Sequence, residues 1–316
     1  MAREWGTHTT VLARLVELLR RRAGGRPRLT VAAVAYAIVR LLTRGQERAP
    51  LPVRWRHIVN VWIIFADWLW WDVLCGLRRR VLLAAPEAAF TRHERLMLVL
   101  APHHLIWTAG SLVPRTMLTR LGRTIRLDRA MVNAHSALFH VPVLRELCIA
   151  LNFRAASRAV GAESASSIAV FPGGGLEMQL QRPGRDTLVL RRGFVSLAIE
   201  RGMPIVPVYL PNETAVYAPL PHFARLRERV YGASKAGVPL WTGWGGVPLS
   251  PLPSRGRYLC VIGAPIDVGR ARAPSAADVD AALAAWEEAM RLLHAKFARS
   301  AGRDAGHAIA FDRSRL

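Results

Sequence analysis

The stretch from Ile168 to Tyr209 constrains the fold of this chain most, because it combines two apolar runs with three consecutive glycines. Ile168 to Phe171 is a short apolar segment that ends in the Pro-Gly-Gly-Gly sequence at 172–175, a pattern typical of a buried strand followed by a tight turn. Residues 193–200 have a helical pattern, and residues 204–209 form a second apolar run. The sequence therefore predicts a strand, a glycine turn, a basic segment, a helix and a second strand.

The glycine turn has two interpretations. Backbone N–H groups at Gly173, Gly174 and Gly175 can be presented to a ligand, and the carboxyl group of Glu177 follows directly. On spacing alone, such a turn is more often only a turn, because glycine is the usual residue where φ is positive. The pattern matches no P-loop and no dinucleotide fingerprint, since no Lys-Ser/Thr pair and no spaced glycine triplet follow.

Apolar runs and helical patterns alternate through the rest of the chain from about residue 93, which predicts an α/β fold. Pro102-His103-His104 follows an apolar run directly, and polar groups at strand ends are where open α/β sheets bind ligands. Residues 211–253 are rich in Pro, Gly and Trp and are expected to be loops over the site, with a basic helix near 222–229. The further predicted elements are strands at 96–101, 125–127 and 258–262 and helices at 105–118, 143–151 and 275–297.

The N-terminal 80 residues differ in composition from the rest. Residues 1–22 predict an amphipathic helix, and the apolar segment at 31–42 is shorter than the ~20 residues that span a bilayer. Residues 55–77 contain five tryptophans interrupted by Asp67 and Asp72, which favours the lipid–water interface over a membrane span. A tryptophan-rich core helix is the alternative.

Composition limits the classes of partner. The net charge of +22 arises from 44 basic and 22 acidic residues, which favours anionic partners such as acidic lipids or a phosphorylated substrate, although arginine excess also arises from coding bias. Nucleic-acid binding is not expected, because the aromatic residues gather in an apolar segment and no nucleic-acid module is present. The three cysteines lie in apolar runs without metal-ligand or disulfide spacing, which fits a reducing compartment.

Several motifs in the same order resemble the type 2 diacylglycerol acyltransferase family, which also contains monoacylglycerol and wax-alcohol acyltransferases. The resemblance covers roughly residues 55–297. The family's His-Pro-His-Gly motif is altered here to Ala101-Pro102-His103-His104, which keeps only the second histidine. The motifs are FHVPVLRE at 139–146, ASR at 156–158, FPGGGLE at 171–177, the LVLRRGF to PNETAVY stretch at 188–217, and GVPLSPLPSRGRYLCVIGAPI at 246–266.

This resemblance implies a membrane-bound O-acyltransferase that moves a fatty acyl group from acyl-CoA to diacylglycerol and forms triacylglycerol. Alternative acceptors are monoacylglycerol, a wax or isoprenoid alcohol, or a lysophospholipid, and a catalytically degenerate lipid-binding protein is a further alternative. It implies a glycerolipid-acyltransferase-like fold, with a central mixed sheet flanked by helices and an N-terminal membrane-associated helical segment. The implied regions are residues 1–80 at the membrane, an acyltransferase domain at 81–300 and a disordered tail at 301–316.

The resemblance also implies the setting of the reaction. Acyl-CoA is a co-substrate, a neutral lipid alcohol is the acceptor, and no metal or other cofactor takes part. Membrane lipid is a partner, nucleic acid is not, and a homo-oligomer is compatible with the family. The expected location is the cytosolic face of the endoplasmic reticulum membrane or the surface of lipid droplets.

The catalytic residues implied by the resemblance are His103 and Glu177. Imidazole titrates near neutrality and suits a general base, although a lone histidine after a strand is more often structural. Related glycerol-phosphate acyltransferases carry an Asp five residues after the histidine, where this chain has Thr108 or, counted from His104, Ala109. Glu177 is therefore expected to orient the imidazole or set the charge of the pocket. Its alternative role is to complement a helix N-terminus.

The remaining candidates would bind substrate. Gly173, Gly174 and Gly175 offer N–H donors for an oxyanion or a phosphate. Arginines suit the phosphates of CoA, although any one of them is more often a solvated surface residue. His104 occupies the family's glycine position, and His140 and Glu213 match family positions without a physical role derived from the residues. The candidate arginines are Arg182, Arg185, Arg191 and Arg192.

Overall fold

A computed structural model describes twelve segments of the chain: residues 69–76, 78–104, 120–124, 130–141, 144–157, 167–182, 184–211, 213–234, 240–250, 252–254, 257–302 and 307–314. The predicted N-terminal helices, most of the tryptophan-rich segment, the predicted helix at 105–118 and the predicted strand at 125–127 lie outside these residues.

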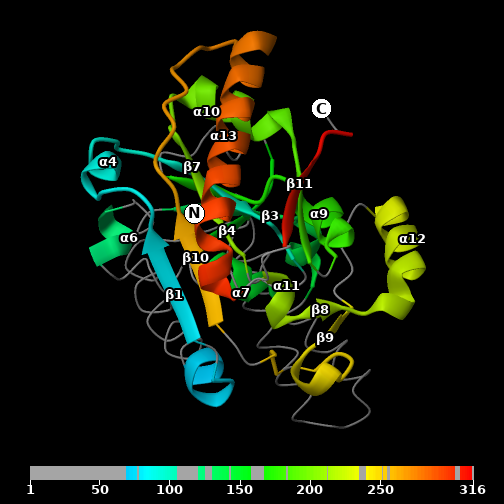
Figure 1. The fold of residues 1–316 in the computed structure, drawn as a ribbon. Helices are drawn as coiled ribbons and strands as arrows, with labels where there is room; N and C mark the ends of the chain where they lie inside the picture. The colour runs from blue at the N-terminus through cyan, green and yellow to red at the C-terminus, as the bar shows by residue number, and fades with distance from the viewer. Residues whose placement is uncertain are drawn as a thin grey trace, which may run out of the picture.

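Seven strands form a central sheet in the order β1-β10-β7-β2-β5-β3-β4 (Figure 1). Each neighbouring pair is parallel except β10 and β7, which are antiparallel, so the predicted mixed sheet is confirmed. The strands are β1 (Arg78–Leu83), β2 (Met97–Ala101), β3 (Met131–Ala134), β4 (Phe153–Ala155), β5 (Ile168–Val170), β7 (Ile205–Tyr209) and β10 (Arg257–Ile262).

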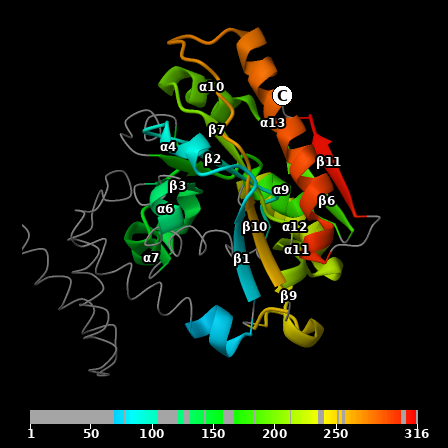
Figure 2. The same cartoon turned by 60° about the vertical axis from the view of Figure 1, so that its left-hand side comes forward.

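Helices cover both faces of this sheet. Successive residues of a strand point to opposite faces, so the apolar residues on each face are buried against a different set of helices. Figure 2 shows α13 on one side of the sheet and α6 and α7 on the other. Leu98 and Leu100 of β2 pack in the cluster that includes α7, whereas Met97 and Val99 pack in the cluster that includes α10 and α13. The described helices are α4 (Ala88–Thr91), α6 (Arg120–Thr124), α7 (Leu144–Ala150), α9 (Gly174–Leu180), α10 (Arg192–Arg201), α11 (Glu213–Val216), α12 (Ala224–Ser234) and α13 (Ala276–Phe297).

Ser275 begins α13 as predicted. Its hydroxyl group accepts from the N–H of Asp278 at 3.1 Å, and the Asp278 carboxylate accepts from the N–H of Ser275 at 3.1 Å. This reciprocal capping box satisfies two N–H groups that the first helical turn otherwise leaves without partners.

Two pairs of strands lie outside the central sheet. β6 (Arg185–Val189) pairs in parallel with β11 (Ala308–Asp312), and β8 (Ala218–Pro219) pairs antiparallel with β9 (Trp241–Thr242). The expectation of a disordered tail after residue 300 is therefore wrong for residues 308–312, because β6 offers a free edge along which they hydrogen-bond. Short helical turns complete the description: η1 (Leu69–Leu74), η3 (Ser136–His140), η4 (Pro221–Phe223), η5 (Trp244–Gly246) and η6 (Arg299–Ala301).

None of the helices within the described residues has both the length and the apolar character needed to cross a membrane.

Candidate active site

The site lies where β2 and β5 end. These strands are parallel neighbours, with Met97 opposite Ile168 and Val99 opposite Val170. His103 follows β2 and the glycine run follows β5, so the two motifs meet at one edge of the sheet.

Glu177 connects this edge to the neighbouring strand β6. It lies in the first turn of α9, and its side chain is fully buried. One carboxyl oxygen, Oε1, accepts a hydrogen bond from the backbone N–H of His103, and Oε2 accepts from the backbone N–H of Val189 at 3.0 Å. Glu177 therefore holds the His103 backbone in place, instead of bonding to the imidazole as one form of the prediction had it.

The glycine run makes room for this carboxyl group. A Cβ atom at Gly173 would lie 2.0 Å from Glu177 Oε2 and 2.4 Å from Glu177 Cβ. Both distances are steric clashes, so any residue other than glycine would displace Glu177 or the backbone. Gly174 has a φ of +51°, in the left-handed region that disfavours other residues. The run is also not only a turn, because α9 begins at Gly174.

Burial controls the charge of both central groups. Burial raises the pKa of Glu177 to about 8, and Asp186 adds to the rise, while the N–H groups of Val189 and His103 and the charge of Arg191 oppose it. At neutral pH this carboxyl group is mostly protonated.

His103 is held in its neutral form. Burial lowers the pKa of His103 to about 4, and its ring packs against Phe171 with centroids 4.6 Å apart. The imidazole is therefore unprotonated at neutral pH and can accept a proton, but a pKa of about 4 makes it a weaker base than a histidine that titrates near neutrality. By contrast, the His104 side chain is fully buried, and its role in substrate binding stays a prediction.

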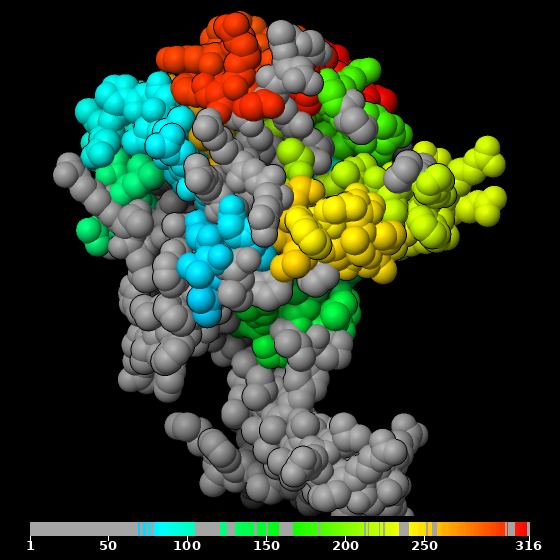
Figure 3. All heavy atoms as spheres, turned by 60° about the horizontal axis from the view of Figure 1, so that its bottom comes forward, coloured from blue at the N-terminus to red at the C-terminus, as the bar shows by residue number. Residues whose placement is uncertain are grey.

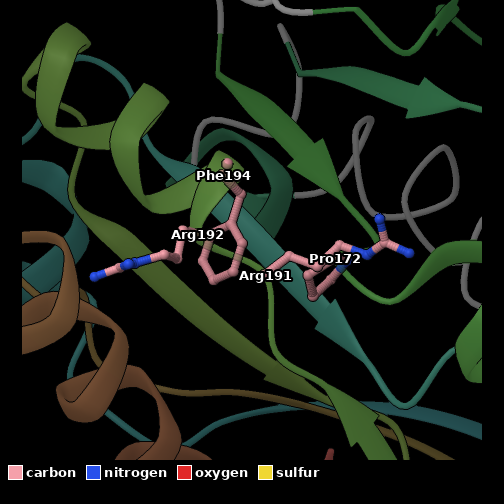
Figure 4. A pocket seen from close by; sticks show the side chains of 5 residues that line it. Pro172, Arg191, Arg192 and Phe194 are labelled. Atoms are coloured by element: carbon pink, nitrogen blue, oxygen red, sulfur yellow. The ribbon is translucent and has the colours of Figure 1, made fainter. Parts of the chain in front are cut away.

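A pocket of about 380 Å³ opens beside the glycine run, lined by Pro172, Arg191, Arg192, Gly193 and Phe194. Figure 4 shows the side chains of Arg191 and Arg192 extending in opposite directions. Arg192 forms an ion pair with Asp280 of α13 and lies 3.4 Å from the Ala276 carbonyl oxygen. Arg191 is exposed and contributes positive charge toward Glu177, so it is the better placed of the two for an anionic ligand.

The other predicted binding residues are outside this pocket lining. The guanidinium group of Arg182 donates to the carbonyl oxygens of Gln179 and Gln181 at 2.7 and 2.9 Å. These hydrogen bonds satisfy two carbonyl groups at the C-terminal end of α9. Arg185 is exposed at the start of β6, and His140 is exposed at the end of η3. Glu213 is buried and accepts a 2.5 Å hydrogen bond from the Tyr258 hydroxyl, which joins α11 to β10.

A buried polar network next to Glu177 was missed from the sequence. Tyr209 Oη donates to Asp186 Oδ2 at 3.0 Å and lies 2.8 Å from His294 Nδ1. His307 Nε2 lies 3.1 Å from Asp186 Oδ1, and the His307 carbonyl oxygen lies 3.1 Å from His294 Nε2. The network joins β6, β7, α13 and the residue before β11. Nothing in the sequence indicated this network, because His307 lies in the C-terminal segment that was predicted to be disordered.

Comparison with known proteins places the chain in a family. A family model described as diacylglycerol acyltransferase matches residues 82–308, well over half of the chain. The chain belongs to the diacylglycerol acyltransferase family. The matched range contains His103, the glycine run and Glu177, and it ends at the first residue of β11. The resemblance seen in the motifs is confirmed.

Individual relatives are distant. Diacylglycerol O-acyltransferase 2 of Dictyostelium discoideum is 26% identical over 151 residues, which covers 43% of this chain and 46% of that protein. Acyl-CoA wax alcohol acyltransferase 2 of Homo sapiens is 34% identical over 89 residues, or 26% of this chain and 27% of that protein. The matches thus span less than half the length of these two relatives.

Among solved structures, the chain is similar to the crystal structure of the 1-acyl-sn-glycerophosphate acyltransferase PlsC from Thermotoga maritima. The two chains are 15% identical, with 92% of this chain and 99% of that chain covered and a TM-score of 0.43.

Proposed function

We propose that this protein is a membrane-bound, acyl-CoA-dependent O-acyltransferase that acylates the free hydroxyl group of diacylglycerol and forms triacylglycerol. The observation that carries the proposal is the placement of a neutral His103 imidazole at a strand end whose backbone is fixed by the buried carboxyl group of Glu177. Family membership supports the reaction class.

In this mechanism the neutral imidazole of His103 takes the proton of the acceptor hydroxyl as its oxygen attacks the thioester carbonyl carbon. The tetrahedral intermediate then collapses, the carbon–sulfur bond breaks, and the departing thiolate receives the proton from the imidazolium ion. The products are the ester and free CoA. The transfer is direct, needs no metal and forms no covalent enzyme intermediate, so a chelator should leave the rate unchanged.

Glu177 acts as a positioning residue in this scheme, because it is fully buried and both of its oxygens bind backbone N–H groups. The backbone N–H groups of Gly173 and Gly175 are assigned to the developing oxyanion, because the N–H of Gly174 already donates to the Phe171 carbonyl oxygen at 3.2 Å. Arg191, at the exposed rim of the pocket, is assigned to the phosphates of CoA. The acceptor resides in a membrane, and the endoplasmic reticulum is the proposed location, which fractionation of expressing cells would test.

The test is incorporation of labelled acyl groups from acyl-CoA into lipid by membranes that contain the full chain. His103→Ala should lower incorporation by about 10²–10⁴-fold, the range that general bases contribute. His222→Ala is the matched control, because His222 is exposed and outside the pocket lining, and it should keep wild-type activity. Unchanged activity of His103→Ala at wild-type expression would remove the proposed mechanism.

A fatty alcohol is the second candidate acceptor, favoured by the 34% identity to the human wax alcohol acyltransferase. Supplying diacylglycerol and a long-chain alcohol together, followed by chromatographic separation of the labelled products, distinguishes the two. Wax ester as the main product would replace the diacylglycerol assignment. Absence of any labelled ester from a folded protein would favour a lipid-binding protein without catalysis.

A further inference from the structure

Residues 240–252, the apolar loop, present large apolar side chains to solvent. Trp244, Val247, Leu249 and Leu252 have exposed fractions between 37% and 53%. In Figure 3 the residues of this part of the chain form the yellow bulge of the surface. Isolated exposed apolar residues are common, whereas a group of them on one loop marks an interaction surface.

A second segment adds to this end of the molecule. Leu69 and Val73, one turn apart on η1, are 37% and 50% exposed. In Figures 1 and 2, η1 (the unlabelled blue coil) and η5 (the unlabelled yellow coil) lie at the same end of the fold. Arg80 follows η1 on β1 and is exposed. Apolar side chains from distant parts of the sequence are therefore exposed at the same end of the fold.

The charge pattern of the apolar loop identifies those surroundings. No charged residue occurs between Lys235 and Arg255, although 21% of the chain is charged. Cations flank this uncharged stretch at both ends, and the whole chain has a net charge of +22. Exposed apolar side chains on a strongly cationic chain suit an anionic bilayer surface, where acyl chains lie beneath negative head groups.

The backbone of the apolar loop can enter a region of low polarity at little cost in lost hydrogen bonds to water. Hydrogen bonds inside the segment satisfy most of its N–H groups, so they need no water when the loop enters a region of low polarity. The indole N–H of Trp241 donates to the Ser250 carbonyl oxygen at 2.7 Å, while Trp244 is half exposed, as tryptophans at lipid–water interfaces are. The N–H groups of Gly243, Trp244, Gly246, Val247, Leu249, Ser250 and Leu252 all donate to oxygens of residues 241–252.

We propose that the apolar loop is a docking element that inserts its side chains into the head-group region of an anionic lipid bilayer. It lies in the C-terminal half of the chain and is therefore separate from the membrane contact expected of residues 1–80. The inference depends on surface chemistry alone and is independent of acyl transfer.

Site-specific labelling of the full chain tests this contact directly. Val247→Cys introduces a thiol at the exposed loop, where an environment-sensitive NBD fluorophore can be attached. The native thiols should not react, because Cys75, Cys148 and Cys260 are buried, and burial raises the pKa of each, to about 12 for Cys148 and Cys260. Leu292→Cys is the matched control, since Leu292 is an apolar residue of α13 with 61% exposure.

Vesicles of equal parts phosphatidylcholine and phosphatidylserine should shift the emission of the label at 247 to the blue and protect it from aqueous iodide. The label at 292 should remain accessible to iodide on the same vesicles. In addition, Trp244→Glu should weaken vesicle binding about tenfold, because it replaces apolar surface with a charge. Circular dichroism of each variant would establish that it is folded.

Three outcomes would overturn the proposal. The first is a label at 247 that stays accessible to iodide on vesicle-bound protein, and the second is equal protection at 247 and 292. The third is blue-shifted emission at 247 before vesicles are added, together with a dimeric mass, which would mean that a second copy of the chain covers the loop.

Discussion

The Cβ atom that Gly173 lacks would lie 2.0 Å from Glu177 Oε2. The glycine run and the buried carboxyl group are therefore one structural unit, in which the absence of a side chain at one residue creates the space that the other fills. The same carboxyl group fixes the backbone of His103, so a change at Gly173 should reach the proposed base through Glu177.

Gly173→Ala tests this unit. The added methyl group should displace the Glu177 carboxyl group, lower the free energy of unfolding by ~1–3 kcal/mol as overpacking does, and abolish most acyl transfer. Gly232→Ala on α12 is the control, because nothing lies within 4 Å of its missing Cβ atom, and alanine in a helix should leave stability equal or slightly higher. Thermal unfolding and acyl incorporation measure both effects. Wild-type values for Gly173→Ala would show that the unit tolerates a side chain.

The pH dependence of stability should show the buried Glu177. Its pKa is raised from 4.5 to about 8, so the folded protein binds more protons than the unfolded chain in that range, and stability falls as pH rises, by at most ~1.4 kcal/mol per pH unit. The pKa of His103 is lowered from 6.5 to about 4, which gives the opposite slope between those values. The two effects oppose each other below about pH 6.5, and the fall due to Glu177 remains up to about pH 8.

Glu177→Gln removes this titration. The variant should be less stable overall, because an amide NH₂ group faces a backbone N–H at one of the two sites that the carboxyl group serves. Its stability should no longer fall between about pH 6.5 and 8, as measured by urea unfolding at a series of pH values. A slope identical to that of the wild type would assign the titration to another group.

Four strands of the sheet, β2, β5, β7 and β10, were predictable because their residues form apolar runs. The others were not, because β1 begins with three arginines and β3 and β4 are only four and three residues long. β6 was not predicted, because its sequence RDTLV begins with two charged residues and its partner strand β11 lies near the C-terminal end of the chain. The nearness of Glu177 to His103 was predicted from family resemblance, but its contact with the backbone of Val189 requires the tertiary placement of β6.

Loss of His307 should destabilise the fold through Asp186. His307→Ala removes the side chain that lies 3.1 Å from the fully buried Asp186 carboxylate, and should lower the free energy of unfolding by ~1–3 kcal/mol, the cost of taking a partner from a buried polar group. Arg313→Ala is the control on the same terminal segment, because Arg313 is exposed and the buried Glu287 keeps its ion pair with Arg291, so the loss should be ~1 kcal/mol or less. Chemical unfolding measures both, and equal small losses would indicate that β11 contributes little.

Substitutions of Arg191 and Arg192 should have different effects, one on substrate binding and the other on stability, because their side chains point in opposite directions. Arg191→Ala should raise the KM for acyl-CoA about tenfold with little change in kcat, since a charge-assisted hydrogen bond to phosphate contributes ~1.5–3 kcal/mol. Arg192→Ala should leave KM within about twofold and lower thermal stability slightly, because its partner Asp280 is an exposed residue of α13. Steady-state kinetics with varied acyl-CoA decide between them, and a larger KM effect at Arg192 would move the phosphate contact to the other side of the pocket.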